Sequence, residues 1–423
     1  MHYILTTVGS AGDVHPIIAL GIALQQRGHR VSVLTNAYFE ERITGQGLEF
    51  LPLGTREEYL QVESDPLLWD AMKGFQYVVE KALLPSMRPM YDILAKNDPD
   101  ETIVVATSVC FGARIAQEHL GFRLATLALQ PCVLRSVYLA PVLPGPVVPN
   151  RAPRFVKQLY YWLGDMLIAD KICCPEINKL RKELNLPPIR RIFDNWLHSP
   201  DLIVGLFPNW FAPVQPDWPE QLHLTNFPFY DAGDMHNLGD SVETFLQAGE
   251  PPVVFAPGSA MRYAGKFFRE SVEAALLLGK RAILVSGEKS QLPKSLPDSI
   301  AWFPYVPFGS LLPRATALVH HGGIGTTAQA LAAGIPQIVM PLAHDQPDNA
   351  ARVQRLGVGN VLSPKRYTGP QVAETMHHLL SSSDVAAQCR YYADNLADNT
   401  ALEDTCRLLD ELGNNPLSQS QRL

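Results

Sequence analysis

Short apolar runs alternate with longer amphipathic segments along the first half of the chain. Residues 3–8 form an apolar run that ends in a glycine loop at 9–13, and apolar positions then recur at helical spacing up to Gly28. This order predicts a strand, a loop and a helix. The same pattern predicts further strands at 31–35, 102–107, 124–129 and 202–207. Strands separated by helices of this length imply a parallel sheet with helices on both faces.

A second series of the same kind begins after a break. Residues 226–249 hold a cluster of Pro, Gly and Asp with little hydrophobic periodicity, which is typical of a linker. Beyond it the pattern predicts strands at 253–256, 282–286, 300–303, 317–320 and 337–340, and helices at 266–278, 326–333 and 349–356. We expect two doubly wound α/β domains that face a cleft. Their expected bounds are 1–228 for the N-terminal domain, 229–249 for the linker, 250–400 for the C-terminal domain, and 401–423 for a final helix and tail that packs back toward the N-terminal domain.

Composition narrows the class of protein. Of the 423 residues, 47% are hydrophobic and 18% are charged, and 35 Lys and Arg stand against 42 Asp and Glu, a net charge of −7. This balance supplies no overall cationic surface for a phosphate backbone, so nucleic acid is not an expected partner. No stretch reaches the roughly 18 uninterrupted apolar residues of a membrane-spanning helix. The first residues show no export signal, so we expect a cytoplasmic protein.

Three polar patterns are set aside as sites. The six cysteines lack the spacing of metal ligands or of a disulfide framework, and we expect them to be reduced and mostly buried. Asp98 and Asp100 have the spacing of a metal-binding pair but lie in a polar loop ahead of a predicted strand. His377 and His378 lie on a predicted helix near the C-terminus and are interpreted as a surface pair. No metal site is predicted.

Residues 66–186 carry more apolar side chains than one sheet-and-helix domain needs. Aromatic residues recur there, among them Trp69, Phe75, Tyr160 and Trp162, on both sides of a proline-rich run at 141–149. Aromatic side chains at helical spacing usually pack inward. Two interpretations stay open for this insertion, namely additional core and a long pocket for a lipophilic ligand.

The segment 320–327 has the features of an anion site. It lies where a predicted strand ends and a helix begins, and its glycines let backbone N–H groups approach a ligand closely. The helix dipole, the hydroxyls of Thr326 and Thr327 and the ring of His321 would all favour a phosphate there. A tight turn between strand and helix is the alternative explanation of the glycines.

A second polar pair follows the next strand. Asp345 and Gln346 open a predicted helix at the same carboxyl-end edge of the sheet, where ligands of open α/β sheets bind. A carboxylate beside a carboxamide can bind the vicinal hydroxyls of a sugar. Asp345 can also act as an N-cap, and both roles can hold together.

These motifs carry a resemblance to a known family. The segment 302–359, with HHGGIGTT at 320–327, AAGIPQ at 332–337 and HDQPDNA at 344–350, resembles the donor signature of family 1 glycosyltransferases. The openings GSAGDVHP at 9–16 and RGHRV at 27–31 extend the resemblance over almost the whole chain. It implies the two-domain GT-B fold. The pattern is most similar to the rhamnolipid-type rhamnosyltransferases of bacteria, and the sterol and glycopeptide glucosyltransferases share the opening motif.

The resemblance implies a nucleotide-sugar site on the C-terminal domain. His321 and Thr326 match residues that contact the donor phosphates, and Asp345 and Gln346 match the pair that holds the sugar hydroxyls. Gln329 stands where many members have a glutamate on the ribose, which is a departure from the family pattern. The remaining donor-binding positions implied by the family pattern are Gly12, Gly258, Ser259, Tyr305, Val306, Gly323 and Gly325, with Tyr305 and Val306 at the base-stacking position.

The resemblance also implies the catalytic base. Asp13 follows the first strand at the position where family members have a histidine or an aspartate, and we expect it to be the general base. A helix cap is the alternative role of Asp13. His15 is the reserve candidate, because the usual pKa of histidine suits proton transfer.

The function that we expect is that of an inverting glycosyltransferase. It would move a hexose, rhamnose from dTDP-rhamnose or glucose from UDP-glucose, to the hydroxyl of a 3-hydroxyacyl lipid, without a metal or other cofactor. Peripheral contact with a membrane, or a partner enzyme that makes the acceptor, would deliver this lipid. The alternatives are a glucosyltransferase acting on a sterol, polyketide or other lipophilic natural product, a nucleotide-sugar 2-epimerase, and a nonenzymatic binding protein.

Overall fold

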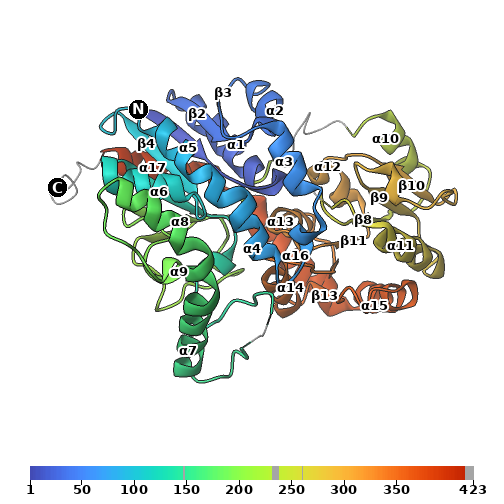
Figure 1. Ribbon diagram of the computed structural model, residues 1–423. Helices are drawn as coiled ribbons and strands as arrows, with labels where there is room; N and C mark the ends of the chain where they lie inside the picture. Colours follow the sequence, from blue (N-terminus) through green and yellow to red (C-terminus); the bar gives the residue numbers. More distant parts are fainter. Residues whose placement is uncertain (146–147, 231–237, 260, 415–423) are drawn as a thin grey trace. The chain divides into compact units, whose positions relative to one another are not determined.

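The computed structural model describes residues 1–145, 148–230, 238–259 and 261–414, and the chain divides into two compact units (Figure 1). The N-terminal unit contains Met1–Pro228 and Thr400–Leu423, and the C-terminal unit contains Phe229–Asn399. Each unit is built on one parallel sheet with helices in the connections between strands, so the prediction of two doubly wound α/β domains is confirmed.

The N-terminal unit has a sheet of seven parallel strands in the order β3-β2-β1-β4-β5-β6-β7. The central strands are continuous apolar runs because both faces of the sheet are covered. The strands are β1 His2–Thr6, β2 Arg30–Thr35, β3 Glu49–Pro52, β4 Thr102–Thr107, β5 Arg123–Ala128, β6 Leu202–Gly205 and β7 Leu222–Leu224. The helices are α1 Ala11–Gln26, α2 Glu40–Thr44, α3 Arg56–Glu63, α4 Gly74–Val78, α5 Leu84–Leu94, α6 Phe111–Leu120, α7 Arg154–Gly164, α8 Asp170–Glu183, α9 Ile192–Asn195 and α17 Ala401–Asn414. Short 3-10 turns (η1 Ala37–Phe39, η2 Pro66–Trp69, η4 Pro131–Val133) and π turns (η3 Val79–Leu83, η5 Asp165–Ala169) complete the connections.

The C-terminal unit has a sheet of six parallel strands in the order β10-β9-β8-β11-β12-β13. Its strands are β8 Val253–Ala256, β9 Ala282–Val285, β10 Ile300–Phe303, β11 Ala317–His320, β12 Gln337–Val339 and β13 Gly359–Val361. Its helices are α10 Asp240–Gln247, α11 Gly265–Leu277, α12 Phe308–Leu311, α13 Ile324–Ala332, α14 Gln346–Arg355, α15 Gly369–Ser381 and α16 Ser383–Ala397, with 3-10 turns η6 Lys289–Gln291 and η7 Leu312–Arg314.

The predicted linker over 229–249 differs from the structure in its second half. Residues 240–247 form helix α10, and its Val242 and Leu246 are buried in the core of the C-terminal unit together with Leu238. The residues between 231 and 237 lie outside the described part of the chain. The apolar spacing of one short helix was hidden by the Pro, Gly and Asp cluster that precedes it.

Helix α17 belongs to the N-terminal unit although it follows the C-terminal unit in sequence (Figure 1). It packs on α1, and its Asp410 accepts hydrogen bonds from the hydroxyl of Tyr3 (3.1 Å) and from Nη2 of Arg27 (2.7 Å). Nε2 of His29 lies 2.9 Å from the same carboxylate. Burial opposes ionisation of Asp410, but the hydrogen bonds from Arg27 and Tyr3 outweigh it and lower the pKa of the carboxyl.

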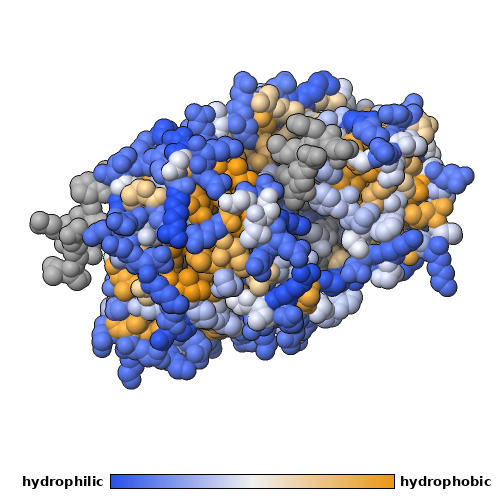
Figure 2. All heavy atoms as spheres, turned by 90° about the horizontal axis from the view of Figure 1, so that it is seen from above, coloured by the Kyte–Doolittle hydropathy of each residue, from blue (hydrophilic) through white to orange (hydrophobic). Residues whose placement is uncertain are grey.

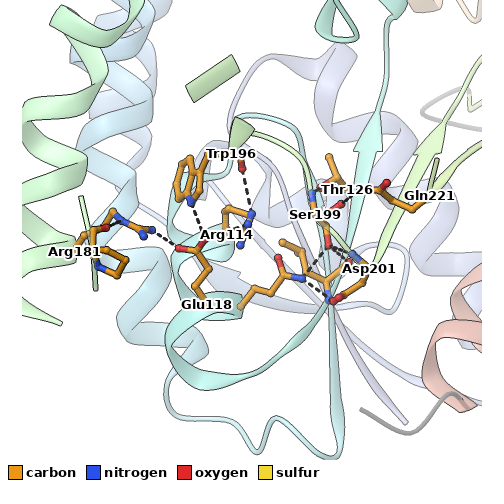
Figure 3. Close-up of polar contacts among 11 residues, drawn as sticks. Arg114, Glu118, Thr126, Arg181, Trp196, Ser199, Asp201 and Gln221 are labelled. Carbon is orange, nitrogen blue, oxygen red and sulfur yellow. Dashed lines mark hydrogen bonds and ion pairs between the residues drawn. The ribbon is translucent and has the colours of Figure 1, made fainter. Parts of the chain in front are cut away.

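A buried polar network braces α6 (Figure 3). Glu118 accepts a hydrogen bond from the indole of Trp196 (3.0 Å) and pairs with Arg114 (3.1 Å) and with Arg181 of α8. A second set of hydrogen bonds centres on Ser199 and involves Gln117, Thr126, Asp201 and Gln221. Because Ser199 precedes β6, this network stabilises the amino-terminal edge of the sheet, opposite to the edge from which the loops after the strands emerge.

Apolar side chains also reach the surface, where they form patches among polar residues (Figure 2). All six cysteines are free, and all but Cys132 are buried, as predicted. Within the described ranges, no helix combines the length and the apolarity that crossing a membrane requires.

Candidate active site

Three loops of the C-terminal unit emerge at the same edge of its sheet. His320, the last residue of β11, is paired with Ala256 of β8 on one side and with Val339 of β12 on the other. The strand order changes direction between β8 and β11, because β9 and β10 lie beyond β8 while β12 and β13 lie beyond β11. Ligands of doubly wound sheets bind at such a switch point. The loops after β8, β11 and β12 carry most of the predicted donor residues.

Two glycines hold the ring of His321. A Cβ atom on Gly323 would lie 2.6 Å from Nε2 of His321, and a Cβ on Gly258 would lie 3.0 Å from its Cε1. Gly258 also has a φ of +110°, which other residues rarely adopt. The ring therefore fits between the loops after β8 and β11 only because both positions lack a side chain.

The loop after β11 is fixed from below by His320, which the sequence analysis did not select. The backbone N–H of Gly322 donates to Nδ1 of His320 (3.2 Å), so the proton of this neutral ring is on Nε2, which donates to Oε1 of Gln337 (3.0 Å). Burial lowers the pKa of His320 to about 3. Gly322 has a φ of +97°, and a Cβ there would lie 2.7 Å from Val339. His320 is thus a positioning residue of the loop.

The environment of His321 keeps its ring neutral. Burial lowers the pKa of His321 to about 4, against an opposing effect of the Ala256 carbonyl. A diphosphate close to the ring would favour the protonated form. The ring would then become a charged hydrogen-bond donor when an anion arrives.

Helix α13 presents its N-terminus at the same edge. Gly323 is its N-cap and makes no side-chain cap, and the first intrahelical hydrogen bond runs from Thr327 N–H to the Gly323 carbonyl (2.9 Å). The N–H groups that precede it are the donors that a helix leaves unpaired at its start. A Cβ on Gly325 would meet nothing within 4 Å, and Thr326 is partly exposed. Thr327 is fully buried, so the expectation that its hydroxyl contacts a phosphate is wrong.

Asp345 and Gln346 play different parts in the loop after β12. Asp345 is the N-cap residue of α14, but its side chain makes no capping hydrogen bond. Its Oδ2 accepts from Nδ2 of Asn349 (2.6 Å), which also donates to the Gly322 carbonyl (2.9 Å). Gln346 is 3% exposed, and its Oε1 accepts from the backbone N–H of Leu342 (2.7 Å). Asp345 therefore remains the partly exposed member of the pair, while Gln346 supports the loop.

Asn349 is a second residue that the sequence analysis did not select. It is fully buried, and it joins the loop after β11 to the loop after β12. The residue before Asp345, His344, has a φ of +59°, a strained conformation that such residues adopt mainly at functional sites.

The other predicted donor residues are spread over the unit. Tyr305 follows β10 and is 51% exposed, whereas Val306 is buried in the core, so the structure does not support Val306 as a base-stacking residue. Ser259 is exposed after β8, and Gln329 is partly exposed one turn after Thr326 on α13. Contacts thus bring together Gly258, His321 and Gly323, and Asn349 connects them to Asp345.

Asp13 lies at the corresponding switch point of the N-terminal unit, after β1 and beside β4. It is the N3 residue of a capping box whose N-cap is Ser10, and its Oδ2 accepts from the backbone N–H (2.8 Å) and the hydroxyl (3.2 Å) of Ser10. A Cβ on Gly9 would lie 2.2 Å from this oxygen. Burial raises the pKa of Asp13, although the hydrogen bonds from Ser10 oppose the shift. The residue caps the helix and also has the raised pKa of a candidate base.

The geometry argues against His15 as a base. Nη1 of Arg42 lies 2.6 Å from Nε2 of His15, and because arginine only donates, this nitrogen is an acceptor. Burial and the charge of Arg42 lower the pKa of His15 to about 4. Gly12 is exposed and donates to the hydroxyl of Ser10 (3.3 Å).

The apolar insertion follows both interpretations only in part. Leu83, Met87, Met90 and Tyr91 are buried, as additional core would be. Phe75 and Trp162, however, are 38% and 44% exposed. The enclosed space beside Tyr160 has a volume of about 10 Å³, enough for one water molecule, and it is lined by Ala140, Pro141, Leu143, Val148, Lys157, Tyr160 and Tyr161. A long enclosed pocket at these aromatic residues is not observed.

Metal ligands are not gathered anywhere in the described ranges, where no three His, Cys, Asp or Glu side chains are grouped as a metal would need. Oδ1 of Asp98 accepts from the backbone N–H of Asp100 (2.9 Å) in the turn before β4. His377 and His378 lie side by side on α15.

Comparison with known proteins agrees with this arrangement. Residues 3–139 match the glycosyltransferase family 28 N-terminal domain, and residues 278–410 match the C-terminal domain of erythromycin biosynthesis protein CIII-like proteins. The chain is 30% identical over 370 residues to glycosyltransferase GtfE of Amycolatopsis orientalis, with 85% of each chain covered. It is 27% identical over 435 aligned positions to O-mycaminosyltylonolide 6-deoxyallosyltransferase of Streptomyces fradiae, with 97% of each covered.

Solved structures show the same architecture. The crystal structure of the glycosyltransferase of kitacinnamycin matches with a TM-score of 0.72 at 19% identity, covering 97% of this chain and 98% of the other. The fold and the comparisons together define a nucleotide-sugar-dependent glycosyltransferase of the GT-B type. More narrowly, the chain belongs to the glycosyltransferase family that includes GtfE. The similarity to rhamnolipid-type enzymes stays a prediction.

The contact between Gly323 and His321 yields a first test. Gly323→Ala would push the ring out of its place, because the added Cβ needs the position of Nε2, and we expect UDP and dTDP to bind at least about tenfold more weakly, or 1.4 kcal/mol. Isothermal titration calorimetry measures this loss. Gly265→Ala, in the first turn of α11, is the matched control, since a Cβ there meets nothing closer than 3.7 Å. Equal affinities for the two variants would exclude the role of the ring.

The lowered pKa of His321 yields a second test. The free ring is neutral above pH 5, and a bound diphosphate would raise its pKa, so binding takes up a proton and the affinity for a nucleotide sugar rises as the pH falls from 8 toward 5. Calorimetry in buffers of different ionisation enthalpy measures the proton uptake. His321→Gln should abolish both effects. A pH-independent affinity of the unsubstituted protein would contradict the model of the site.

Proposed function

We propose that the protein is an inverting glycosyltransferase that moves a hexose from a nucleoside diphosphate sugar to a hydroxyl of a lipophilic acceptor, with Asp13 as the general base. The observation that carries this proposal is the state of Asp13. Its carboxyl has a raised pKa, and it is held by Ser10 through one oxygen only. A base with a pKa nearer to neutrality accepts a proton more effectively than an ordinary carboxylate.

The donor is assigned to the C-terminal unit. The diphosphate would bind the N-terminus of α13, with hydrogen bonds from His321 and the hydroxyl of Thr326. Asp345 would accept hydrogen bonds from the sugar hydroxyls, Tyr305 would stack on the base, and Gln329 would bind the ribose. Gly258, Gly323 and Gly325 leave room for the ligand or for the His321 ring.

The reaction is a single displacement. The acceptor oxygen attacks the anomeric carbon while Asp13 removes its proton, and because both hydrogen bonds from Ser10 go to Oδ2, Oδ1 is the atom that receives it. The bond between the anomeric carbon and the diphosphate oxygen breaks as the new bond forms, so the configuration inverts. The nucleoside diphosphate leaves with the electron pair, and the α13 N-terminus and His321 stabilise its charge. We propose that this needs no metal.

A 3-hydroxyacyl lipid is our first candidate for the acceptor, with rhamnose or glucose as the sugar. Its support is the partly exposed apolar surface around Trp69 and Phe75, near the start of the insertion. A membrane surface, or the enzyme that makes the lipid, would have to deliver such a molecule. The second candidate is a sterol, polyketide or other lipophilic natural product. It is favoured by the small enclosed space beside Tyr160, since a long acyl chain has no tunnel there, and by the printed names of the antibiotic-related relatives.

Asp13→Asn tests the base. We expect turnover to fall by about 10² or more while the affinity for the donor changes only a few-fold, because loss of a general base costs about 10²–10⁴ and the donor is assigned to the other unit. Ser10→Ala removes a hydrogen bond that lowers the pKa of Asp13, so the rise of kcat/KM with pH should move to higher pH. Turnover near that of the unsubstituted enzyme in Asp13→Asn would remove Asp13 from the mechanism.

A donor-by-acceptor screen by mass spectrometry tests the substrate assignment. UDP-glucose and dTDP-rhamnose are offered with 3-hydroxyacyl lipids of graded length, sterols and polyketide aglycones, with and without a chelator. For a lipid acceptor, shortening one chain by two carbons should weaken binding about tenfold, from about 0.8 kcal/mol per methylene. Product from sterols or polyketides alone would select the second candidate. Strict dependence on a divalent metal would contradict the proposed handling of the leaving group.

A further inference from the structure

Helix α7 and the π turn η5 that follows it expose their apolar face. Of the eighteen large hydrophobic residues that are exposed in the described chain, seven lie between Phe155 and Ile168. Phe155 is 68% exposed, Leu159 53%, Leu167 51% and Ile168 54%. The others are Trp162, Leu163 and Met166. An ordinary surface helix would turn such residues toward the core.

The face that α7 and η5 turn inward is polar instead. Lys157, Tyr161 and Asp165 follow one another at intervals of four residues, and all three are buried. Nζ of Lys157 donates to the Tyr138 carbonyl (3.1 Å), and the hydroxyl of Tyr161 donates to the Ser136 carbonyl (3.1 Å).

The inward carboxylate is paired as well. Asp165 is fully buried and lies 2.6 Å from Nη1 of Arg135, whose guanidinium also stacks 5.2 Å over the ring of Tyr161. These contacts satisfy the buried charges, and so the register of the helix is fixed with its apolar side outward. Rotating the helix to bury the apolar side would expose the hydrocarbon cores of the packed neighbours and break three polar contacts.

The charges beside this face have one sign. Between residues 151 and 171 the exposed charged side chains are Arg151, Arg154 and Lys171, while Asp165 is buried and Asp170 is only partly exposed. This local positive charge contrasts with the net charge of −7 of the chain. Helix α7 projects from the rest of the N-terminal unit in Figure 1, so the face is accessible to a flat partner.

We propose that the exposed face of α7 and η5 binds the surface of an anionic lipid bilayer. The combination of an apolar face that carries Trp and Phe with flanking Arg and Lys is that of a helix lying in the membrane interface. The apolar side chains enter the acyl boundary, and the three cations meet anionic headgroups. A second copy of the chain fits less well, because a twofold contact would bring the same cations together. The proposal does not depend on which acceptor the enzyme uses.

Vesicle sedimentation with the full chain tests this surface. The protein should bind vesicles of phosphatidylcholine and phosphatidylglycerol at least fivefold more tightly than phosphatidylcholine alone. Leu159→Ser with Leu167→Ser should reduce binding at least tenfold. The matched control is Leu276→Ser with Leu277→Ser on α11, which are 52% and 59% exposed and should leave binding unchanged. Arg151→Gln with Lys171→Gln should remove the preference for anionic lipid. Circular dichroism confirms that each variant is folded.

Fluorescence quenching locates the contact. Brominated lipids should quench part of the tryptophan emission of the bound protein, and Trp162→Phe, which keeps the site apolar, should remove that part. Binding that is equal in the Leu159/Leu167 variant and the α11 control would overturn the proposal. So would a lack of vesicle binding, whether the protein stays monomeric or self-associates through this face in analytical ultracentrifugation.

Discussion

The parallel pairing of the strands is the constraint on which the site depends. Because every strand of a sheet points the same way, the loops after β8, β11 and β12 must emerge at one edge, although they are far apart in sequence. Close approach of these loops then demands small residues, and Gly258 and Gly323 leave the space that the ring of His321 fills. The phosphate-binding chemistry follows from strand direction first and from residue type second.

The sequence predicted the strands that are buried on both faces and failed at the edges of the sheets. β3, β7 and β13 were missed because they are short and partly exposed, so they lack the continuous apolar run of a central strand. The donor motif named His321, Thr326 and Asp345 correctly as residues of one edge. It could not reveal His320 or Asn349, whose buried polar side chains act only on neighbouring loops, nor that Gln346 points inward.

Helix α7 shows why an amphipathic pattern does not by itself tell which side is buried. The spacing of its apolar residues led to the expectation of core or pocket, yet the partners that decide its orientation are Arg135, Ser136 and Tyr138, in a loop just before it. A buried Lys157 is costly without a partner, and here the Tyr138 carbonyl accepts from it. Tertiary hydrogen bonds outweigh the periodicity, because they satisfy charges that hydrophobic packing cannot.

The return of α17 to the N-terminal unit has a consequence for biosynthesis. The chain leaves this unit after Pro228 and re-enters it at Thr400, so the whole C-terminal unit is inserted between α1 and the helix that covers it. At about 5–20 residues per second, a ribosome exposes α1 for roughly 20–80 s before α17 emerges. Tyr3, Arg27 and His29 wait during that interval for Asp410. A truncated chain leaves this face of α1 uncovered, and quality-control proteases can recognise it as incomplete.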